Sequence, residues 1–351
     1  MEHAVHSILK GQPVSASAPC RIDLGGTLDI AVFYYPMSYL GPLTFNIALD
    51  MRTTVRVSAH TPGFVKVSSR GFDPAEYPID RVPFNHPMGL IFAIAAYFRI
   101  DGVHIEINSA SPPRSALGGS SSAAVAVIGA FNRLLSLAGT GDIKPERIPE
   151  LAHALEETVA GVPCGCQDQL AAAYGGVHAW HWKGVGRDCW YEREPLLEPR
   201  KAAWLNERML VAYCGIPHES ADINSRWIRG FIDGTWRKQW VGIIESTHGF
   251  IRAFKAGDVP SAVRQMQRET AIRLEITPDV LDDIGVKLVA SAEAAHCAAR
   301  FTGAGGGGCI WAFGEPGRIS SLKPEWETIL GSRNDARLLQ TSVDMAGLTG
   351  C

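Results

Sequence analysis

Residues 112–124 read Pro-Pro-Arg-Ser-Ala-Leu-Gly-Gly-Ser-Ser-Ser-Ala-Ala, and this stretch decides the fold. A strongly apolar run begins directly after it, at Val125, and continues to Leu135. Gly118 and Gly119 let the backbone approach a ligand closely, and the serines after them are typical of a helix start. The first amides of a helix lack internal partners and attract anions. The stretch therefore predicts a phosphate-binding loop at the start of a buried helix.

The composition predicts a globular protein of two domains, or of one large one. The chain has 351 residues, of which 46% are hydrophobic, which is enough to bury substantial cores. The net charge is −3 and no Lys/Arg-rich run occurs, so we expect no nucleic-acid partner. The N-terminus does not look like a signal peptide, and the longest apolar run, residues 90–98, is shorter than the roughly 20 residues of a membrane span. We expect a soluble cytoplasmic protein without a membrane partner or a disulfide framework, and leave a homodimer open.

The loop at 112–124 resembles the phosphate loop of the GHMP kinases, the superfamily of galactokinase, homoserine kinase and mevalonate kinase. No lysine follows the glycines, which excludes the Gly-x-x-x-x-Gly-Lys-Ser/Thr loop. The family pattern is Pro-x-x-x-Gly-Leu-Gly-Ser-Ser-Ala-Ala, with Ala116 here at its first glycine and Gly119 at a serine. A Ser/Gly linker that caps a core helix is the alternative for this stretch alone. The resemblance implies an ATP site made by Pro113, Ala116, Leu117, Gly118, Gly119, Ser120, Ser121 and Ser122.

A second glycine-rich loop covers residues 303–308, Gly-Ala-Gly-Gly-Gly-Gly. Gly303, Gly305 and Gly308 satisfy Gly-x-Gly-x-x-Gly, but that dinucleotide fingerprint needs a strand before it and a helix after it. We predict the reverse order here, a helix over 283–298 and a strand over 309–313. The loop resembles one that leans against the phosphate loop in GHMP kinases, which implies that Gly305 and Gly306 help to bind the nucleotide. A flexible hinge is the alternative.

Asp168 is the candidate catalytic residue, in the segment Gly161-Val-Pro-Cys-Gly165-Cys-Gln167-Asp168-Gln169. Phosphoryl transfer needs a group that accepts or orients the proton of the attacking hydroxyl, and an ionised carboxylate does this. The segment resembles galactokinase in Gly-Val-Pro-Cys-Gly and the heptose-phosphate kinases in Gln-Asp-Gln. The resemblance implies that Asp168 faces the attacking hydroxyl and that Gly165 and Gln167 lie at the sugar. An aspartate that caps a turn is the alternative.

A carboxylate upstream of Asp168 is the predicted magnesium ligand. Glu156 and Glu157 both lie about three helical turns before Asp168, and Mg²⁺ prefers oxygen ligands and takes few carboxylates from the protein. The spacing in galactokinase-like chains favours Glu156, together with Ser120 of the phosphate loop. The predicted cofactors are therefore ATP and Mg²⁺.

The segment Arg21-Ile-Asp-Leu-Gly-Gly-Thr27-Leu-Asp29 resembles the opening of the GHMP sugar kinases, Arg-Ile-x-Leu-x-Gly-Gly-x-Thr-Asp. The loop is one residue shorter here. In those kinases the arginine lies near the catalytic aspartate and the last aspartate holds sugar hydroxyls. The resemblance therefore implies a catalytic role for Arg21 and substrate contacts for Thr27 and Asp29. A strand-end arginine in a salt bridge and a turn aspartate are the alternatives.

A polar segment of the second half, residues 218–227, follows a predicted strand and starts a predicted helix. In related sugar kinases a segment at this place faces the substrate, which implies that Ser220, Asn224 and Arg226 contact the sugar. Arg226 and Arg114 are the candidates for binding a phosphate on the substrate. The alternative is an ordinary polar helix N-terminus.

The hydrophobic pattern predicts an α+β fold, because strands and helices alternate without a regular βαβ rhythm. We place a domain boundary near residue 200, which gives an ATP-binding domain over 1–200 and a second domain over 201–351. The resemblance implies a βαβ crossover in the first domain and a ferredoxin-like second domain. The predicted helices cover 88–99, 120–137, 147–160, 220–275, 283–298 and 324–330. The predicted strands cover 14–24, 53–58, 64–68, 103–108, 175–182, 208–213, 309–313 and 336–343.

The resemblance as a whole implies an ATP- and Mg²⁺-dependent sugar kinase. The Gln-Asp-Gln segment and the Arg-Ile-Asp-Leu opening are most similar to kinases that phosphorylate D-glycero-D-manno-heptose 7-phosphate at its anomeric hydroxyl. The alternatives are a galactose or fucose kinase, a mevalonate or homoserine kinase, and a catalytically inactive sugar-binding paralogue. A NAD-binding enzyme is a further alternative from another class.

Overall fold

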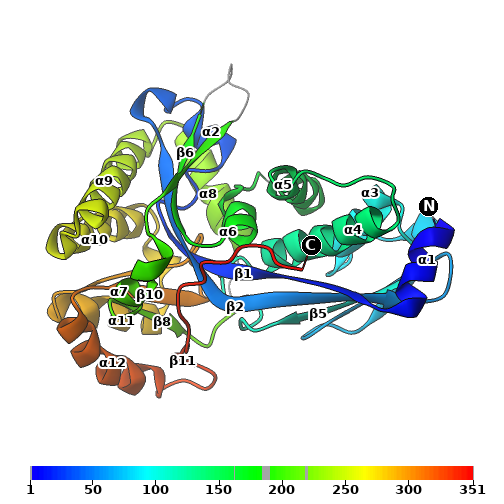
Figure 1. Cartoon of the computed structure of the whole chain (residues 1–351). Coiled ribbons are helices and arrows are strands. Elements are labelled where there is room, and N and C mark those ends of the chain that lie inside the picture. The colour runs from blue at the N-terminus through cyan, green and yellow to red at the C-terminus, as the bar shows by residue number, and fades with distance from the viewer. Residues whose placement is uncertain (1, 162, 184–189, 218–219, 351) are drawn as a thin grey trace.

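Two β-sheets, one from each half of the chain, organise the fold (Figure 1). The computed structural model describes residues 2–161, 163–183, 190–217 and 220–350, except the side chains of 2–4 and 220–222. Within these residues, the first sheet contains β1 (Val14–Leu24), β2 (Leu43–Ala59), β3 (Phe64–Ser69), β4 (Ala75–Pro78), β5 (Val103–Ser109), β6 (Val177–Trp182) and β7 (Tyr191–Pro195). The second contains β8 (Met209–Tyr213), β9 (Ala298–Phe301), β10 (Cys309–Phe313) and β11 (Arg337–Leu338).

A long antiparallel pair, β1 with β2, forms the spine of the first sheet. Its register runs from Val14 opposite Val57 to Leu24 opposite Phe45. Strand β2 also pairs with β5 and β6, and β7 lies outside β6. Strands β3 and β5 are parallel, so the chain crosses over between them through β4 and the helix α3 (Gly89–Phe98). This is the predicted βαβ crossover.

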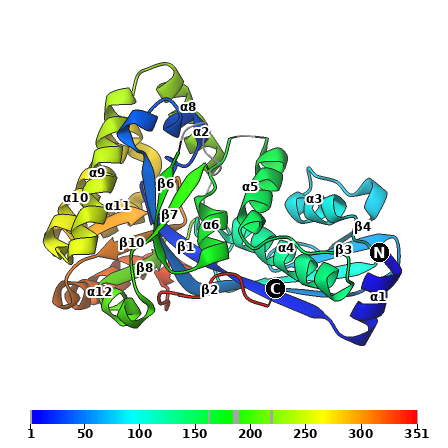
Figure 2. The ribbon, with the colours of Figure 1, turned by 45° about the horizontal axis from the view of Figure 1, so that its top comes forward.

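Helices cover one side of β1 and β2 in both views (Figure 1, Figure 2). The central one is α4 (Gly119–Leu137), which packs against β1 and β2 and is flanked by α5 (Arg147–Ala160) and α6 (Gln167–Tyr174). Of the described helices, α4 is the one long and apolar enough to cross a membrane, and 67% of its apolar window is buried inside the structure, as in a core helix. The same element thus supplies both the core of the first half and the end of the phosphate loop.

The second sheet has the strand order β11-β8-β10-β9, and all its pairings are antiparallel. In chain order this is fourth, first, third, second, the arrangement of a ferredoxin-like domain. Four helices connect β8 to β9, and one connects β10 to β11. They are α8 (Ser220–Ile232), α9 (Arg237–Ala256), α10 (Val259–Ile276), α11 (Asp283–Ala294) and α12 (Pro316–Leu330).

Short elements join these parts. They are α1 (Glu2–Gly11), α2 (Ala31–Tyr34), η1 (Ser38–Leu40), η2 (Ile79–Arg81), η3 (Pro199–Lys201), α7 (Ala202–Asn206) and η4 (Pro278–Val280). The predicted boundary near residue 200 lies in the connection between β7 and β8, and we propose that it separates two domains. The last residues nevertheless return to the first sheet, where Val343 bridges Leu49 and Thr349 bridges Ser17 (Figure 2).

Several predicted elements differ from the structure. The helix predicted over 283–298 ends at Ala294, and β9 follows it directly, so a strand and not a helix precedes the second glycine loop. The dinucleotide fingerprint still fails, because a strand follows that loop. Strands β4, β7 and β9 were missed because four or five residues show too little alternation to be recognised. The last helix is longer than predicted, since α12 begins at Pro316 and accommodates Pro324.

Candidate active site

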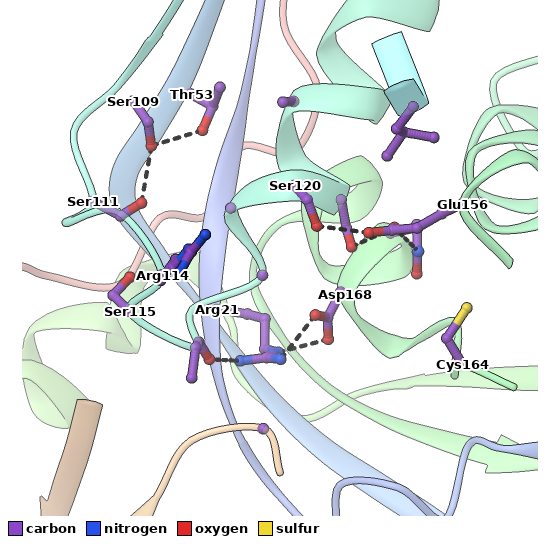
Figure 3. Close-up of a pocket in the computed structure, with 18 of the residues that line it drawn as sticks. Arg21, Thr53, Ser109, Ser111, Arg114, Ser115, Ser120, Glu156, Cys164 and Asp168 are labelled. Atoms are coloured by element: carbon purple, nitrogen blue, oxygen red, sulfur yellow. Dashed lines mark hydrogen bonds and ion pairs between the residues drawn. The ribbon is translucent and has the colours of Figure 1, made fainter. Parts of the chain in front are cut away.

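A pocket of about 510 Å³ lies where the two halves of the chain meet (Figure 3). Its lining includes the turn after β1, the phosphate loop with the start of α4, the start of α6 and the second glycine loop, together with residues of β3, α3 and β5 and their flanking turns. Most of the lining residues come from the first half of the chain, and Asn224, Gly303 and Ala304 come from the second. The sequence predictions of two ligand-binding glycine loops and a catalytic segment therefore converge on one cavity.

Arg21 and Asp168 form a bidentate ion pair in this pocket (Figure 3). Nε of Arg21 donates to Oδ1 of Asp168 at 2.7 Å, and Nη2 donates to Oδ2 at 2.8 Å. The third nitrogen, Nη1, donates to the carbonyl of Ala116 at 2.7 Å, which ties the pair to the phosphate loop. Burial by itself lowers the pKa of Arg21, but the charges of Asp168 and Asp23 outweigh it and raise the pKa. Arg21 is therefore a permanent cation.

The phosphate loop turns sharply toward the pocket. Ala116 has φ 61° and Gly118 has φ 74°, so the alanine adopts the left-handed conformation that favours glycine. The loop pattern that this segment resembles has glycine at that position. A Cβ on Gly118 would lie 3.0 Å from Oδ2 of Asp168, so the start of α4 lies next to the candidate catalytic carboxylate. The predicted nucleotide-binding residues that line the pocket are Pro113, Ala116, Gly118, Gly119, Ser120 and Ser121.

Leu117 and Ser122 do not line this pocket, contrary to the prediction. The side chain of Leu117 is fully buried in the core, and its carbonyl accepts a hydrogen bond from the amide of Arg21. The hydroxyl of Ser122 donates to the carbonyls of Pro19 and Gly118, at 2.8 and 2.9 Å. Because α4 packs against β1, its third serine faces the sheet. Both residues build the loop without reaching the pocket.

Glu156 lies opposite the first two serines of α4. Ser120 Oγ and Ser121 Oγ donate to its two carboxylate oxygens at 2.6 and 2.7 Å, and Gln169 Nε2 donates at 2.6 Å. Burial raises the pKa of Glu156, and the serine hydrogen bonds oppose that rise. Glu157 is exposed and does not line the pocket, so the geometry selects Glu156 of the two candidates.

This cluster fits a magnesium ion by the chemistry of its donors. It offers a carboxylate and two hydroxyls, and Oε1 of Gln169 is buried without a hydrogen-bond partner among the described residues. All are oxygen ligands, as Mg²⁺ prefers. No set of three His, Cys, Asp or Glu side chains in the described part of the chain forms a separate metal cluster.

The second glycine loop contacts the phosphate loop, as the resemblance implied. A Cβ on Gly308 would lie 2.7 Å from the carbonyl of Ser115, so only glycine fits that contact. Gly303 and Ala304 line the pocket, but the predicted Gly305 and Gly306 do not. The amides of Gly305 and Gly306 donate to carbonyls of the second half, so these two glycines shape the loop.

The turn after β1 places Asp29 at the same end of the pocket as Asp168. Its Oδ2 accepts a hydrogen bond from the amide of Gln167 at 3.1 Å, and a Cβ on Gly165 would lie 1.6 Å from that oxygen. Burial raises the pKa of Asp29 to about 7, which the Gln167 amide opposes and the charge of Asp168 reinforces. We name this end the acceptor end; it comprises Arg21, Thr27, Asp29, Gly165, Gln167 and Asp168.

The side-chain oxygens of Thr27 and Gln167 already accept hydrogen bonds, although both residues line the pocket. Oγ1 of Thr27 accepts from Arg273 at 2.8 Å. Oε1 of Gln167 accepts a hydrogen bond from the side-chain nitrogen Nδ2 of Asn46 at 3.0 Å. Thr27 and Gln167, both predicted to contact the substrate, therefore mainly shape the acceptor end.

The residues of α8 that were predicted to contact the sugar have different positions relative to the pocket. Asn224 lines the pocket, and the side chain of Ser220 lies outside the described residues. Arg226 does not line the pocket, because its guanidinium makes a bidentate pair with Asp279, with two hydrogen bonds of 2.9 Å. Arg114 is exposed and lines the pocket from the phosphate loop, close to Ser111 and Ser115 (Figure 3).

Sequence reasoning missed Asp23, Gln169 and Arg273. Asp23 is fully buried, 3.5 Å from Arg21, and accepts a hydrogen bond from the amide of Gly303 at 2.7 Å. Alternation along β1 was a usable signal for it, because residues 21 and 23 point to the same face of a strand. Arg273 is far away in the sequence, and no local pattern indicates its contact.

Comparisons with known proteins agree with this geometry. The family model described as "GHMP kinases N terminal domain" matches residues 85–176, which include the phosphate loop, Glu156 and Asp168. The chain is 26% identical to a mevalonate kinase of Thermococcus sibiricus over 325 residues, which cover 85% of this chain and 88% of that one.

Solved structures share the fold over nearly the whole chain. A D-glycero-D-manno-heptose 1-phosphate kinase from Bacteroides thetaiotaomicron superposes with a TM-score of 0.71 at 19% identity, covering 95% of this chain and 97% of that one. A Lactococcus lactis galactokinase in complex with galactose gives a TM-score of 0.74 at 16% identity, covering 97% and 95%. At these identities the likeness concerns the fold alone.

Proposed function

We propose that this chain, which belongs to the GHMP kinase superfamily, transfers the γ-phosphate of ATP to a hydroxyl of a neutral sugar. As a kinase of this superfamily it is an ATP-dependent phosphotransferase with an alcohol acceptor, and the proposal concerns the acceptor and the residue roles. The observation that carries it is the bidentate pair of Arg21 with Asp168 beside the start of α4. That pair places a fixed carboxylate next to a phosphate-binding terminus.

Asp168 orients the attacking hydroxyl and accepts its proton. Arg21 donates a hydrogen bond to each carboxylate oxygen of Asp168, which fixes the carboxylate in one orientation. The remaining lone pairs can accept a hydrogen bond from the acceptor hydroxyl. Since phosphoryl transfer relies on positioning and charge stabilisation, a rigid carboxylate at this place supplies what the acceptor side needs.

The nucleotide side consists of the start of α4 and the cluster around Glu156. Gly119 and Ser120, the first residues of α4, line the pocket. Since the first amides of a helix have no partner inside it, a phosphate bound there would find free N–H donors. Glu156, Ser120 and Ser121 would hold Mg²⁺, which supplies charge neutralisation of the phosphates when it is bound. Arg114 adds a cation on the phosphate loop itself.

The charge of the acceptor end favours a neutral substrate. Among the described residues of that end, Arg21 is the sole cation, and Asp168 already pairs with it. Asp29 adds a second carboxyl group, which suits the hydroxyls of a sugar and repels an anion. A mevalonate-like acceptor would bring a carboxylate to this end without an unpaired cation to meet it.

A heptose 7-phosphate, predicted from the sequence, is the second candidate. Arg226 lies on α8, two residues after the pocket-lining Asn224, and its partner Asp279 has a 66% exposed side chain. A substrate phosphate could replace Asp279 on the guanidinium. Such an exchange costs the existing ion pair, so the geometry ranks this acceptor below a free sugar.

ADP release with Mg-ATP tests the proposal against a panel of acceptors. The panel contains galactose, fucose, mannose, mannoheptose 7-phosphate, sedoheptulose 7-phosphate and mevalonate. We expect turnover with a neutral sugar. Turnover confined to a heptose phosphate, with a strong loss in Arg226→Ala, would support the second candidate. ATP binding without turnover on any acceptor would instead indicate an inactive sugar-binding paralogue.

A further inference from the structure

The turn that carries Asp29 adopts an unusual backbone conformation. Thr27, a β-branched residue, has φ 70°, in the left-handed region that such residues rarely occupy. The turn is closed by two backbone hydrogen bonds, from the amide of Leu28 to the carbonyl of Gly25 and from Ile30 to Thr27, at 3.4 and 3.0 Å. A strained turn persists only where the surrounding structure holds it, so its support must come from elsewhere in the fold.

Arg273 of α10 supplies that support from the second half of the chain. Its Nη1 donates to Oγ1 of Thr27 at 2.8 Å, and its Nη2 donates to the carbonyl of Gly26 at 2.5 Å. The side chain of Arg273 is fully buried, and its guanidinium carbon lies 4.7 Å from the ring centroids of both Trp227 and Trp240. The two indoles and the fork geometry fix the guanidinium in one orientation.

A buried chain of ion pairs connects Arg273 to the catalytic pair. Glu269 accepts from Nε of Arg273 at 2.9 Å and from Nε of Arg300 at 2.8 Å. Arg300 in turn lies 3.2 Å from Oδ2 of Asp23, whose Oδ1 is 3.5 Å from Arg21. With Asp168 at its end, the chain contains three guanidinium groups and three carboxylates.

This charge balance explains how so many ions can be buried together. Asp23, Glu269, Arg273 and Arg300 have no exposed side-chain surface. Each ion has an opposite charge within hydrogen-bond distance, which is what burial of charges requires. The four inner members, Arg21, Asp23, Arg300 and Glu269, each have two oppositely charged neighbours, so the turn and the catalytic pair share one rigid frame.

We propose that Arg273 is a positioning residue for the acceptor: it holds Gly26 and Thr27 so that Asp29 faces the sugar hydroxyls. This inference rests on the proposed function. Arg273 does not line the pocket, so it acts through the turn and not by contact with substrate. The consequence is that a residue of α10 determines acceptor affinity. It reaches the nucleotide side only indirectly, through the ion pairs that lead to Arg21 and from there to the carbonyl of Ala116.

The test compares Arg273→Lys with Arg268→Lys, a matched change on the same helix. Lysine keeps the charge beside Glu269 but cannot bond both Gly26 and Thr27. Arg268 is half-exposed and pairs with Glu245, so its replacement leaves the turn intact. We expect Arg273→Lys to raise the KM for the sugar at least tenfold while the KM for ATP stays within twofold, and Arg268→Lys to change neither.

Hydrogen exchange of the amides of Leu28 and Ile30 gives a second readout that needs no catalysis. We expect at least tenfold faster exchange in Arg273→Lys and no change in Arg268→Lys. Thr27→Gly in the Arg273→Lys background should restore slow exchange, because glycine adopts φ 70° without strain. An ATP affinity close to that of the wild type in every variant confirms that the variant is folded.

Three results would overturn the inference. They are unchanged exchange in Arg273→Lys, an equal rise in both KM values, and faster exchange without a change in the sugar KM. Failure of the proposed function is a separate outcome, because wild-type protein would then turn over no acceptor. In that case the acceptor role of Arg273 falls with it, while the exchange rates still decide whether Arg273 anchors the turn.

Discussion

The guanidinium of Arg21 holds both carboxylate oxygens of Asp168 and, with its third nitrogen, the carbonyl of Ala116. One side chain on β1 thereby fixes the candidate catalytic group relative to the phosphate loop. In the proposed reaction the acceptor and the nucleotide meet at this junction, since Gly118 lies against Asp168 on one side and Asp29 lies at the same end of the pocket. In the proposed reaction, the contacts of Arg21 with Asp168 and Ala116 fix the distance between the two substrates.

Asp168→Asn should reduce kcat by about 10²–10⁴-fold, the usual contribution of a positioned acid or base. The amide cannot accept the hydroxyl proton, although it keeps the size of the carboxylate. ATP affinity should change by less than about threefold, because Asp168 does not contact the predicted magnesium cluster. Single-turnover kinetics and ATP titration measure the two effects. Wild-type turnover in this variant would remove Asp168 from the mechanism.

Acceptor binding should depend on pH through Asp29. Its pKa of about 7 means that the carboxyl is largely protonated at pH 6 and ionised at pH 8. Sugar hydroxyls donate more strongly to the ionised form, so kcat/KM for the sugar should rise with pH across this range. The Asp29→Asn variant should lose this rise and bind sugar about tenfold more weakly at pH 8. A rise that persists in the variant would assign the titration to another group.

The same group makes a prediction about stability. Because the folded-state pKa of Asp29 is raised above its ordinary value of 3.8, the folded protein holds this proton more tightly than the unfolded chain. Its contribution to the free energy of unfolding is therefore complete below pH 4 and declines as pH rises to about 7. Urea unfolding at pH 5.5 and at pH 8 measures this effect. The free energy of unfolding should fall less between these two pH values in Asp29→Asn than in the wild type.

Glu156→Gln should raise the Mg²⁺ concentration needed for half-maximal turnover by about tenfold or more. The carboxylate is the one anionic donor of the cluster with Ser120 and Ser121, and Mg²⁺ binding depends on such a charge. Glu157→Gln is the matched control, since Glu157 is adjacent in sequence but exposed. Equal effects of the two substitutions in a Mg²⁺ titration would contradict the assignment.

Gly165→Ala should weaken sugar binding strongly, because the added Cβ would lie 1.6 Å from Oδ2 of Asp29 and must displace it. We expect at least a tenfold rise in the KM for the sugar with little change in the KM for ATP. Gly317→Ala is a suitable control, as its Cβ would meet no atom within 4 Å. An unchanged sugar KM in Gly165→Ala would show that Asp29 does not hold the acceptor.

Local sequence predicted the features whose physical cause is local. The glycines and serines of 117–122 start a helix and leave amides unpaired, whatever the rest of the chain does. Residues 123–131 of α4 carry no polar side chain, so the burial of this part of the helix follows from composition. Arg21, Glu156 and Asp168 were identified because each lies in a short motif, and the structure brings all three to one pocket.

Side-chain direction was less predictable than position. Ser120, Ser121 and Ser122 are equivalent in the sequence, yet the first two face Glu156 and the third faces Pro19. Which serine faces which way depends on how α4 is rotated against β1. Likewise, Arg226 suggested a phosphate contact, and only the packing of α8 beside Asp279 shows that the guanidinium is already paired.

The sequence by itself determined the α+β class and the helix behind residues 112–118, and it supplied the candidate phosphate loop and the candidate catalytic carboxylate, because these depend on residues close together in the chain. Only the tertiary structure decided what joins the two halves. Arg273 meets Thr27 across 246 positions of sequence, and Arg300 meets Asp23 across 277. The periodicity of the sequence does not predict such contacts, because a buried charge needs an opposite charge near it in space and not near it in the sequence.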